Sequence, residues 1–370
     1  MGTIRLVSTA REFVIDVRPG EAIVESFRRS NLPVLATLLL SPEGRFVSLS
    51  HVPAADEEVV AYSLRNPDFT CLQPSYGLAP AADPCTELIR PLQDPKHLAL
   101  VQFSRADGFR FAFESFEAIV SSYCGQSGGA QAGEPAAGKV LQVALSSGGD
   151  GRVLAECIRA YRDRHPETRF HCVITAVGFE DEAEHVGNAV KIAERFDLPY
   201  EVYGVNDAAD LLGMTTDLEQ ASHNFRNEFP DDEPEVLGTY WVQQVNFGAA
   251  RAGRRRAILF GFNQEDVIAD RIYQLMTQKH LPPFPVRRLD EFDIVAPLSQ
   301  VPKKLLDSLD LENSLRNYDM RLPSVSYLRS SLYFIAYMIA ESFPAIADVL
   351  SGKELQGEDP EEIIQWLASQ

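Results

Sequence analysis

Residues 139–163 run without interruption from a strand pattern through a small-residue loop into a helix pattern. The letters K-V-L-Q-V-A-L lead into S-S-G-G-D-G, and apolar residues then recur at helical spacing, at Val153, Leu154, Cys157, Ile158 and Tyr161. A strand that opens through small residues onto a helix turns backbone N–H groups and the positive end of the helix dipole toward the loop. The pattern therefore predicts a site for a phosphate-sized anion at the start of this helix.

Strand and helix patterns alternate over the rest of this region. We expect strands at 140–145, 170–176, 200–203 and 257–261, and helices at 151–163, 181–196, about 234–251 and 264–279. The strands are short continuous apolar runs, as expected when helices cover both faces of a parallel sheet. Ligands bind such sheets at the carboxyl ends of the strands. Both the small-residue loop and G-F-N-Q-E-D (261–266) fall at such ends.

The first 70 residues have the order ββ-α-ββ-β. Strands are predicted at Ile4–Val7, Phe13–Val17, Leu35–Leu40, Phe46–Leu49 and Val59–Leu64, with a helix at Ala22–Arg29. In pattern and length this small α+β domain resembles the β-grasp fold of ubiquitin and the sulfur-carrier proteins. The resemblance implies an accessory or interaction domain. The alternative, a covert carrier tail, would use Gly128-Gly129.

The remaining segments frame the main region. Residues 71–138 read as an irregular connector, with a hairpin from 97–103 and 109–113 around R-A-D-G, a helix at 114–123 and a flexible linker at 125–138. The main domain is placed at 139–310, and a helical C-terminal extension at 311–370. Apolar residues at helical spacing between 327 and 339 predict either core or the surface of a homodimer. Asp359 is expected to cap a last helix.

Charge and hydropathy limit the classes of partner that this chain is expected to bind. The 370 residues contain 34 basic and 53 acidic side chains, a net charge of −19, which disfavours tRNA because nucleic-acid affinity comes mostly from neutralised phosphates. The run R-A-G-R-R-R (251–256) reads as a solvated helix end or as a local basic patch. No run of 18 uncharged apolar residues occurs, and no secretory segment opens the chain. We expect a cytoplasmic protein without a membrane span.

Five cysteines form no C-x-x-C pair. Cys157 and Cys172 fall on a predicted helix face and strand, where a free cysteine packs as a small buried hydrophobe. Cys71, Cys85 and Cys124 lie in irregular sequence, and a metal or iron–sulfur site there has no spacing to support it. Their role stays open.

The loop itself excludes two common phosphate motifs. It has no Lys for the G-x-x-x-x-G-K-[ST] loop, and its glycines have the wrong spacing for G-x-G-x-x-G. Residues 146–151 instead resemble the S-G-G-x-D-S loop of the N-type ATP pyrophosphatases, also called PP-loop enzymes, within the HUP-like adenine-nucleotide α-hydrolase superfamily. The departures are Ser147 for Gly and Gly151 for Ser.

Three later segments resemble the same superfamily in order. Residues 173–202 are similar to its second βαβ unit. Residues 255–270 are similar to the G-H-N-x-x-D segment of its tRNA-thiolating members, with Phe262 in place of His. Residues 294–304 are similar to their R-P-L-x-x-[IV]-x-K segment. The resemblance covers about 139–310, and the loop start also resembles the asparagine-synthetase-like branch.

The resemblance implies a chemistry and a set of site residues. Such enzymes bind ATP and let a substrate oxygen attack the α-phosphorus, which releases pyrophosphate and leaves an adenylate for displacement by sulfur or nitrogen. It implies that Asp150, Asp266, Lys303 and Lys304 act in catalysis, with Asp150 and Asp266 also holding Mg²⁺. Contacts to ATP are expected from Ser146, Ser147, Gly148, Gly149, Gly151, Arg152, Ile174, Ala176, Val177, Gly261 and Asn263.

Each acidic or basic candidate also has a purely structural interpretation. Asp150 may be read as a helix cap, Asp266 as a first-turn acid, and Lys303 and Lys304 as solvated helix starts. The substrate is expected to be a small molecule or a protein-borne group, with a sulfur-carrier protein as partner. Two alternatives stand beside this adenylating enzyme: a nucleotide-binding sensor or interaction protein with a degenerate loop, and a tRNA thiolase.

Overall fold

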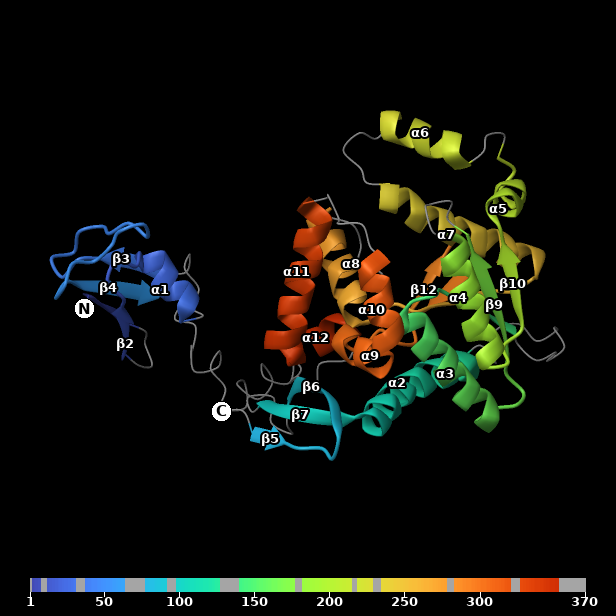
Figure 1. Ribbon diagram of the computed structural model, residues 1–370, viewed down its shortest axis with the longest axis horizontal. Helices are drawn as coiled ribbons and strands as arrows, with labels where there is room; N and C mark the ends of the chain where they lie inside the picture. Colours follow the sequence, from blue (N-terminus) through green and yellow to red (C-terminus); the bar gives the residue numbers. More distant parts are fainter. Residues whose placement is uncertain are drawn as a thin grey trace, which may run out of the picture. The chain divides into compact units, whose positions relative to one another are not determined.

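The computed structural model describes residues 2–7, 12–30, 37–63, 77–91, 98–126, 140–176, 182–214, 218–228, 234–277, 283–320 and 327–352. The chain divides into two compact units, Met1–Ser75 and Tyr76–Gln370 (Figure 1). Each unit has a hydrophobic core of its own.

The first unit is a four-stranded sheet with one helix. Its elements are β1 (Gly2–Val7), β2 (Glu12–Val17), α1 (Ile23–Arg29), β3 (Thr37–Leu40) and β4 (Glu58–Ser63), and the strand order is β2-β1-β4-β3. Strand β1 pairs antiparallel with β2 and parallel with β4. Ile23 and Phe27 of α1 are fully buried with Ile4 and Val59. The β-grasp resemblance remains a prediction.

One strand predicted in this unit is wrong. Residues 46–49 form no strand, and Phe46 makes only an isolated bridge with Leu40. Val47 and Leu49 are partly buried against the core. The apolar residues of this run therefore pack against the core without forming a strand. Their alternation with polar residues led to the wrong prediction.

The second unit begins with a three-stranded sheet and a long helix. Strands β5 (Gly77–Ala79), β6 (Pro84–Pro91) and β7 (Leu98–Ser104) lie in the order β5-β7-β6 and lead into α2 (Arg105–Gln126). The hairpin predicted around R-A-D-G is wrong, because the helix begins there. Phe113, Phe116 and Val120 are buried along one side of α2, so the three-to-four-residue spacing of its apolar residues outweighed their individual preference for strands.

The main sheet has six strands in the order β10-β9-β8-β11-β13-β12. Neighbours from β10 to β13 are parallel, whereas β12 pairs antiparallel with β13. The sheet is thus mixed and not wholly parallel as predicted, because a short hairpin adds an edge strand. Its strands are β8 (Val140–Ala144), β9 (Arg169–Thr175), β10 (Tyr200–Tyr203), β11 (Ala257–Phe260), β12 (Val286–Leu289) and β13 (Phe292–Val295).

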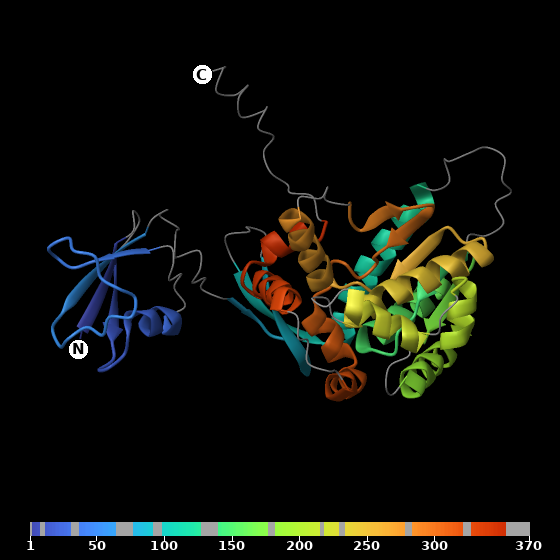
Figure 2. The same cartoon turned by 90° about the horizontal axis from the view of Figure 1, so that it is seen from above.

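Helices cover both faces of this sheet, as the apolar strands predicted (Figures 1 and 2). Residues of α2, α3 (Gly149–Arg164) and α4 (Glu182–Arg195) pack with Leu141, Val143 and Leu259 on one face. Phe247 of α7 (Pro234–Ala252) packs with Ile258 and Phe292 on the other. The short helices α5 (Val205–Leu211) and α6 (Leu218–Glu228) precede α7. Strands β8 and β11 are direct neighbours, so the loops that follow them meet at one edge of the sheet.

The chain after β13 is helical where it is described. It comprises α9 (Lys303–Leu309), α10 (Leu311–Met320), α11 (Tyr327–Ser342) and α12 (Pro344–Leu350), and α11 and α12 pack with α8 (Gln264–Met276), which follows β11. Leu332 and Ala336 of α11 are buried with Ile268 of α8, whereas Phe334 and Met338 are exposed. The homodimer surface remains a prediction, and the helix expected from Asp359 lies outside the described residues.

Two smaller expectations concern membranes and cysteines. Within the described ranges, every helix is too short or too polar to cross a bilayer. Cys157 and Cys172 are fully buried, which confirms their packing role, and burial raises the pKa of both thiols. Cys85 is exposed and Cys124 half-buried, and Cys71 lies outside the described residues.

Candidate active site at the carboxyl ends of β8 and β11

The small-residue loop joins β8 to the first turn of α3. Gly148 is the N-cap, and the first backbone hydrogen bond into the helix is donated by Arg152 N to Gly148 O, at 3.1 Å. The N–H groups of Gly149, Asp150 and Gly151 therefore precede the helix's own hydrogen-bond ladder, as at any helix start. With the helix dipole, they provide the anion-binding geometry that the sequence predicted.

The loop folds too tightly for a side chain at position 151. A Cβ on Gly151 would lie 2.3 Å from the carbonyl oxygen of Ser146 and 2.8 Å from its hydroxyl. The glycine is thus required by the close approach of Ser146. The same distances show that the Ser146 hydroxyl lies against the helix start.

Lys303 reaches this loop from a distant part of the chain. Its segment is attached to the start of α8, because Gln264 N donates to Val301 O at 3.0 Å and Lys303 N donates to a Glu265 carboxylate oxygen at 2.8 Å. The Lys303 side chain is only 12% exposed, and its Nζ lies 3.0 Å from Oδ1 of Asp150. Nζ also forms an ion pair with Asp307, one turn along α9.

Asn263 links Asp150 to Asp266. Asn263 caps α8: its Oδ1 accepts from Asp266 N, and Asp266 Oδ2 accepts from Asn263 N, both at 3.0 Å. Its Nδ2 donates to Asp150 Oδ2 at 3.3 Å. Tyr333 of α11 donates its hydroxyl to the other Asp266 oxygen at 3.0 Å. Asp266 therefore has the structural role expected of an acid in the first turn of a helix, and it also belongs to the site.

Burial and crowding of negative charge raise the pKa values of these acids. Burial, with a smaller contribution from the Asp150 charge, raises the pKa of Asp266 to about 6. Burial likewise raises the pKa of Glu265 to about 7 and that of Asp150 above its ordinary value, although Lys303 opposes the shift at Asp150. For Lys303, burial lowers the pKa, but Asp150 and Asp307 outweigh it and the net shift is upward. Asp150, Asp266, Glu265 and Lys303 form a cluster at the carboxyl ends of β8 and β11, called here the strand-end cluster. Titratable groups with strongly shifted pKa values that gather in this way indicate a candidate functional site.

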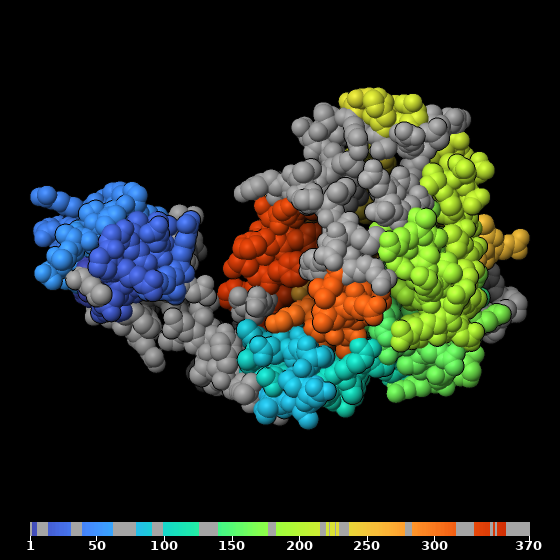
Figure 3. All heavy atoms as spheres, viewed as in Figure 1, coloured from blue at the N-terminus to red at the C-terminus, as the bar shows by residue number. Residues whose placement is uncertain are grey.

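Side chains of α9 and α10 cover the start of α3. A Cβ on Gly149 would lie 2.3 Å from the Ser314 hydroxyl oxygen and 3.7 Å from Asp307 Oδ1. Ser314 donates that hydroxyl to Asp307 at 2.9 Å. Helices α9 and α10 both contact α3, and the space-filling view shows their orange surface next to the green surface (Figure 3). A carboxylate and a hydroxyl of the chain itself therefore lie close to where a phosphate on this helix start would be.

Other predicted residues lie differently. Arg152 is buried and forms ion pairs with Glu156 and Asp310, at 3.1 and 3.6 Å. Lys304 is exposed. Ile174 is buried in the core, and the backbone N–H and carbonyl of Ala176 already bond Tyr203 and Trp241. Gly261 lies beside Leu154 of α3, and Val177 is outside the described residues. The roles expected of these residues toward ATP remain predictions.

Phe262, where the related segment has a histidine, belongs to the core. Its ring stacks on Phe260 with centroids 5.3 Å apart, and it packs with the cluster that joins α7 to the sheet. An aromatic pair of this kind is a packing feature.

The structure adds five residues that sequence reasoning missed. They are His185, Glu265, Asp307, Ser314 and Tyr333. Asp307 carried a signal, because an acid four residues after Lys303 on a helix lies beside it. Glu265 lies in the segment 261–266, which was placed at the sheet edge, but it was not singled out there. The other three come from segments whose contacts no local pattern indicates.

The donor set at this site suits Mg²⁺ only in part. Carboxylate oxygens are the ligands Mg²⁺ prefers, and it commonly uses one or two of them together with phosphate oxygens. Asp150 and Asp266, both bonded to Asn263, provide such a pair. Among the described residues no group of three or more His, Cys, Asp or Glu side chains is arranged for a metal. Their four oxygens already accept from Lys303, Asn263 and Tyr333, so a bound Mg²⁺ would displace some of these contacts, and the role of the pair in holding it remains a prediction.

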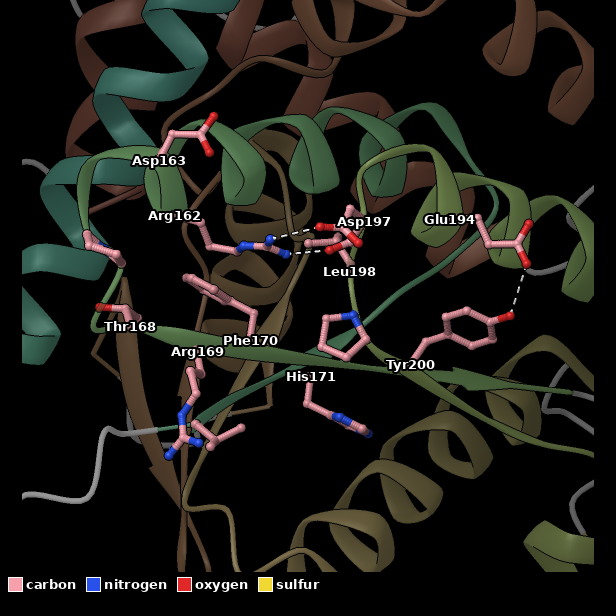
Figure 4. Close-up of a pocket in the computed structure, with 13 residues that line it drawn as sticks. Arg162, Asp163, Thr168, Arg169, Phe170, His171, Glu194, Asp197, Leu198 and Tyr200 are labelled. Atoms are coloured by element: carbon pink, nitrogen blue, oxygen red, sulfur yellow. Dashed lines mark hydrogen bonds and ion pairs between the residues drawn. The ribbon is translucent and has the colours of Figure 1, made fainter.

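A cavity of about 940 Å³ lies elsewhere. It is lined by residues around the amino ends of β8, β9 and β10, among them Arg162, His171, Asp197 and Tyr200. Figure 4 shows Arg162 directed to Asp197, and Tyr200 to Glu194. These two pairs are bonded within the lining, whereas His171 pairs with Glu201 outside it, and none of the predicted site residues lines the cavity. The strand-end cluster remains the candidate active site.

Comparison with known proteins gives distant structural likenesses only. The chain matches no protein-family model and no curated protein. One similar solved structure is the U34-tRNA thiolase NcsA from Methanococcus maripaludis with its 4Fe-4S cluster, at 14% identity over 68% of this chain and 78% of that chain, with a TM-score of 0.49. Another is the NAD+ synthetase from Burkholderia pseudomallei, at 15% identity over 67% and 86%, with a TM-score of 0.37. Likenesses at this level do not assign a function to this chain.

Proposed function

We propose that this chain binds ATP with its phosphates at the start of α3 and transfers the adenylyl group to a substrate oxygen. That oxygen forms a bond to the α-phosphorus, the bond between the α-phosphorus and the bridging oxygen breaks, and pyrophosphate leaves. The resulting adenylate is then open to displacement by a sulfur or nitrogen nucleophile. The acceptor is a small molecule or a protein-borne group.

The observation that carries this proposal is the convergence on α3. Three separate segments meet at the ends of two adjacent strands. They bring together Lys303 Nζ, the N–H groups of Gly149 to Gly151, and the pair Asp150 and Asp266. A fixed positive charge and a helix start both favour phosphate, and preformed donors of this kind stabilise charge as it develops on a leaving group.

Each residue then has a stated role. The N–H groups of α3 would hold phosphate oxygens, and Lys303 would neutralise the charge of the leaving pyrophosphate. Asp150 and Asp266 would hold Mg²⁺, which supplies additional positive charge between phosphate oxygens when bound. Tyr333 and Asn263 would orient the two carboxylates through the hydrogen bonds they already make.

A second candidate function is nucleotide binding without turnover. It is favoured by Asp307 and Ser314, which lie over Gly149 and engage both the helix start and Lys303. Binding would then require Asp307 of α9 and Ser314 of α10 to move away from the helix start, and the protein would report the presence of a nucleotide through that movement. Adenylyl transfer remains the leading proposal, because it also uses the Asp150–Asp266 pair.

Pyrophosphate release separates the two. The purified full chain is incubated with ATP, Mg²⁺ and a dialysed cell extract supplemented with its small-molecule fraction, and pyrophosphate is measured. Lys303→Gln serves as the impaired variant, and Lys191→Gln, at an exposed position on α4, is the control. Release that persists in the Lys191 variant and falls in the Lys303 variant supports adenylyl transfer. ATP binding without release supports the second candidate, and no ATP binding contradicts both.

A further inference from the structure

The loop between β8 and α3 offers three positions for a hydroxyl that could reach a phosphate. Position 151 has no side chain, because a Cβ there would lie 2.3 Å from Ser146 O. The Ser146 hydroxyl lies 2.8 Å from that same Cβ position, against the first turn of α3. Ser146 is exposed and lies beside the helix start, so it keeps its expected role toward ATP, and Ser147 is the second hydroxyl of the loop.

Ser147 has a specific partner. Its Oγ lies 3.0 Å from Nδ1 of His185, in the first turns of α4. Strands β8 and β9 are parallel neighbours, so the loop after β8 lies beside the carboxyl end of β9, the strand that α4 follows in the chain. Both side chains are partly buried. The contact thus belongs to the edge of the sheet that carries the candidate active site.

We infer that Ser147 is a phosphate-binding residue and His185 a positioning residue for it, together replacing the hydroxyl that the loop lacks at position 151. A hydroxyl has one proton to donate and two lone pairs. With the proton of His185 on Nδ1, the imidazole donates to Ser147 Oγ, and the serine proton is left free to point at a phosphate oxygen. This inference rests on the proposed function and assigns two further residues to the same site.

The pair also explains why the loop departs from the related S-G-G-x-D-S pattern in two places together. The serine is absent at the last position, where this backbone has no space for it. A serine appears instead at the second position, within hydrogen-bond distance of a histidine from the neighbouring βα unit. One donor to the phosphates is thereby kept.

Binding of ATP and of inorganic tripolyphosphate, measured by calorimetry, tests the inference. Ser147→Ala and His185→Ala are each expected to weaken binding of both ligands by about tenfold, the effect of one hydrogen bond to a charged group. The double variant is expected to be no weaker than the weaker single variant, because both changes remove the same contact. His185→Asn, whose amide nitrogen can lie near the place of Nδ1, is expected to bind within about threefold of the unsubstituted protein.

Control variants distinguish a role of Ser147 and His185 in phosphate binding from a purely structural role. His223, exposed on α6, is the matched histidine, and His223→Ala should bind as the unsubstituted protein does. Unchanged binding in Ser147→Ala, additive losses in the double variant, or failure of His185→Asn to restore binding would each overturn the inference. If the unsubstituted chain binds neither ATP nor tripolyphosphate, the proposed function fails and the inference fails with it. That outcome differs from the others, in which the unsubstituted chain binds and only the variants depart from expectation.

Discussion

Lys303 and Asp150 lie 153 residues apart in the chain and form an ion pair of 3.0 Å, with the lysine side chain only 12% exposed. The pair joins the first turn of α3 to the first turn of α9, and so fixes the C-terminal helices to the small-residue loop. Since a buried charge that loses its partner is costly, the contact contributes to stability as well as to the proposed chemistry.

Replacing Lys303 by Met should destabilise the protein. Asp150 and Asp307 would lose their common positive partner while staying largely buried, which costs roughly 3 kcal/mol. Lys304→Met removes the exposed neighbour and should change the free energy of unfolding by less than about 0.5 kcal/mol. Urea denaturation of both variants measures the difference. Equal changes in the two variants would show that the ion pairs of Lys303 do not contribute to the free energy of unfolding.

Asp307→Asn should strengthen ATP binding. The substitution removes a negative charge that lies beside the helix start and occupies Lys303, while the amide can still accept from Ser314. We expect a roughly tenfold lower dissociation constant, the size of one nearby charge–charge term at intermediate dielectric. Asp163→Asn is the matched control, because Asp163 is exposed at the opposite end of α3, far from the helix start. Weaker or unchanged binding in Asp307→Asn would mean that this carboxylate does not oppose the nucleotide.

Gly151→Ser restores the serine of the related loop pattern, yet we expect it to damage this loop. Its Cβ would lie 2.3 Å from a backbone oxygen that can move only with the loop. The expected loss is about 1–3 kcal/mol, as for other overpacked sites. Gly187→Ser in α4, with nothing within 4 Å of its Cβ position, should be neutral or stabilising. A thermal melt of the two variants tests this. Equal melting temperatures would contradict the tight loop geometry.

Glu265 should make the protein less stable at high pH. Burial raises its pKa from 4.5 to about 7, so between these values the folded protein holds a proton that the unfolded chain has lost. The free energy of unfolding therefore falls as pH rises through this window and stays lower above it. Glu265→Gln should match the unsubstituted protein below pH 4.5 and exceed it at pH 8 by up to about 3 kcal/mol.

Denaturation at pH 4.5 and pH 8 measures this effect. Glu184→Gln, exposed on α4, should show no gain at pH 8. A Glu265→Gln variant that is equally or less stable at pH 8 would show that this carboxyl is not penalised by burial.

Local pattern was enough to predict most of the main sheet. Continuous apolar runs placed β8, β9, β10 and β11 to within a residue or two of their observed bounds, because a strand covered on both faces must be apolar throughout. The loop and the start of α8 were placed at one sheet edge for the same reason. That Asp150 and Lys303 belong to one site was expected only through the family resemblance, and the ion pair between them was not predicted.

What the sequence did not predict depends on packing at a distance. The helix over Phe109–Phe113 was read as a strand, since aromatic residues favour strands until a helical face buries them. Likewise, the cover of Gly149 by Ser314 and the approach of Tyr333 to Asp266 arise from how α10 and α11 pack. No periodicity within those helices indicates where their polar side chains lie.

The central claim, that nucleotide phosphates bind at the start of α3, is tested most directly by the backbone amide resonances of Gly149, Asp150 and Gly151. The full chain, labelled with nitrogen-15 and assigned, is titrated with ATP and Mg²⁺ and then with tripolyphosphate. The account predicts that these three amides shift with both ligands, while Gly187 and Gly213 do not. Resonances that stay in place, or shifts confined to the residues around Arg162 in the cavity of Figure 4, would contradict it.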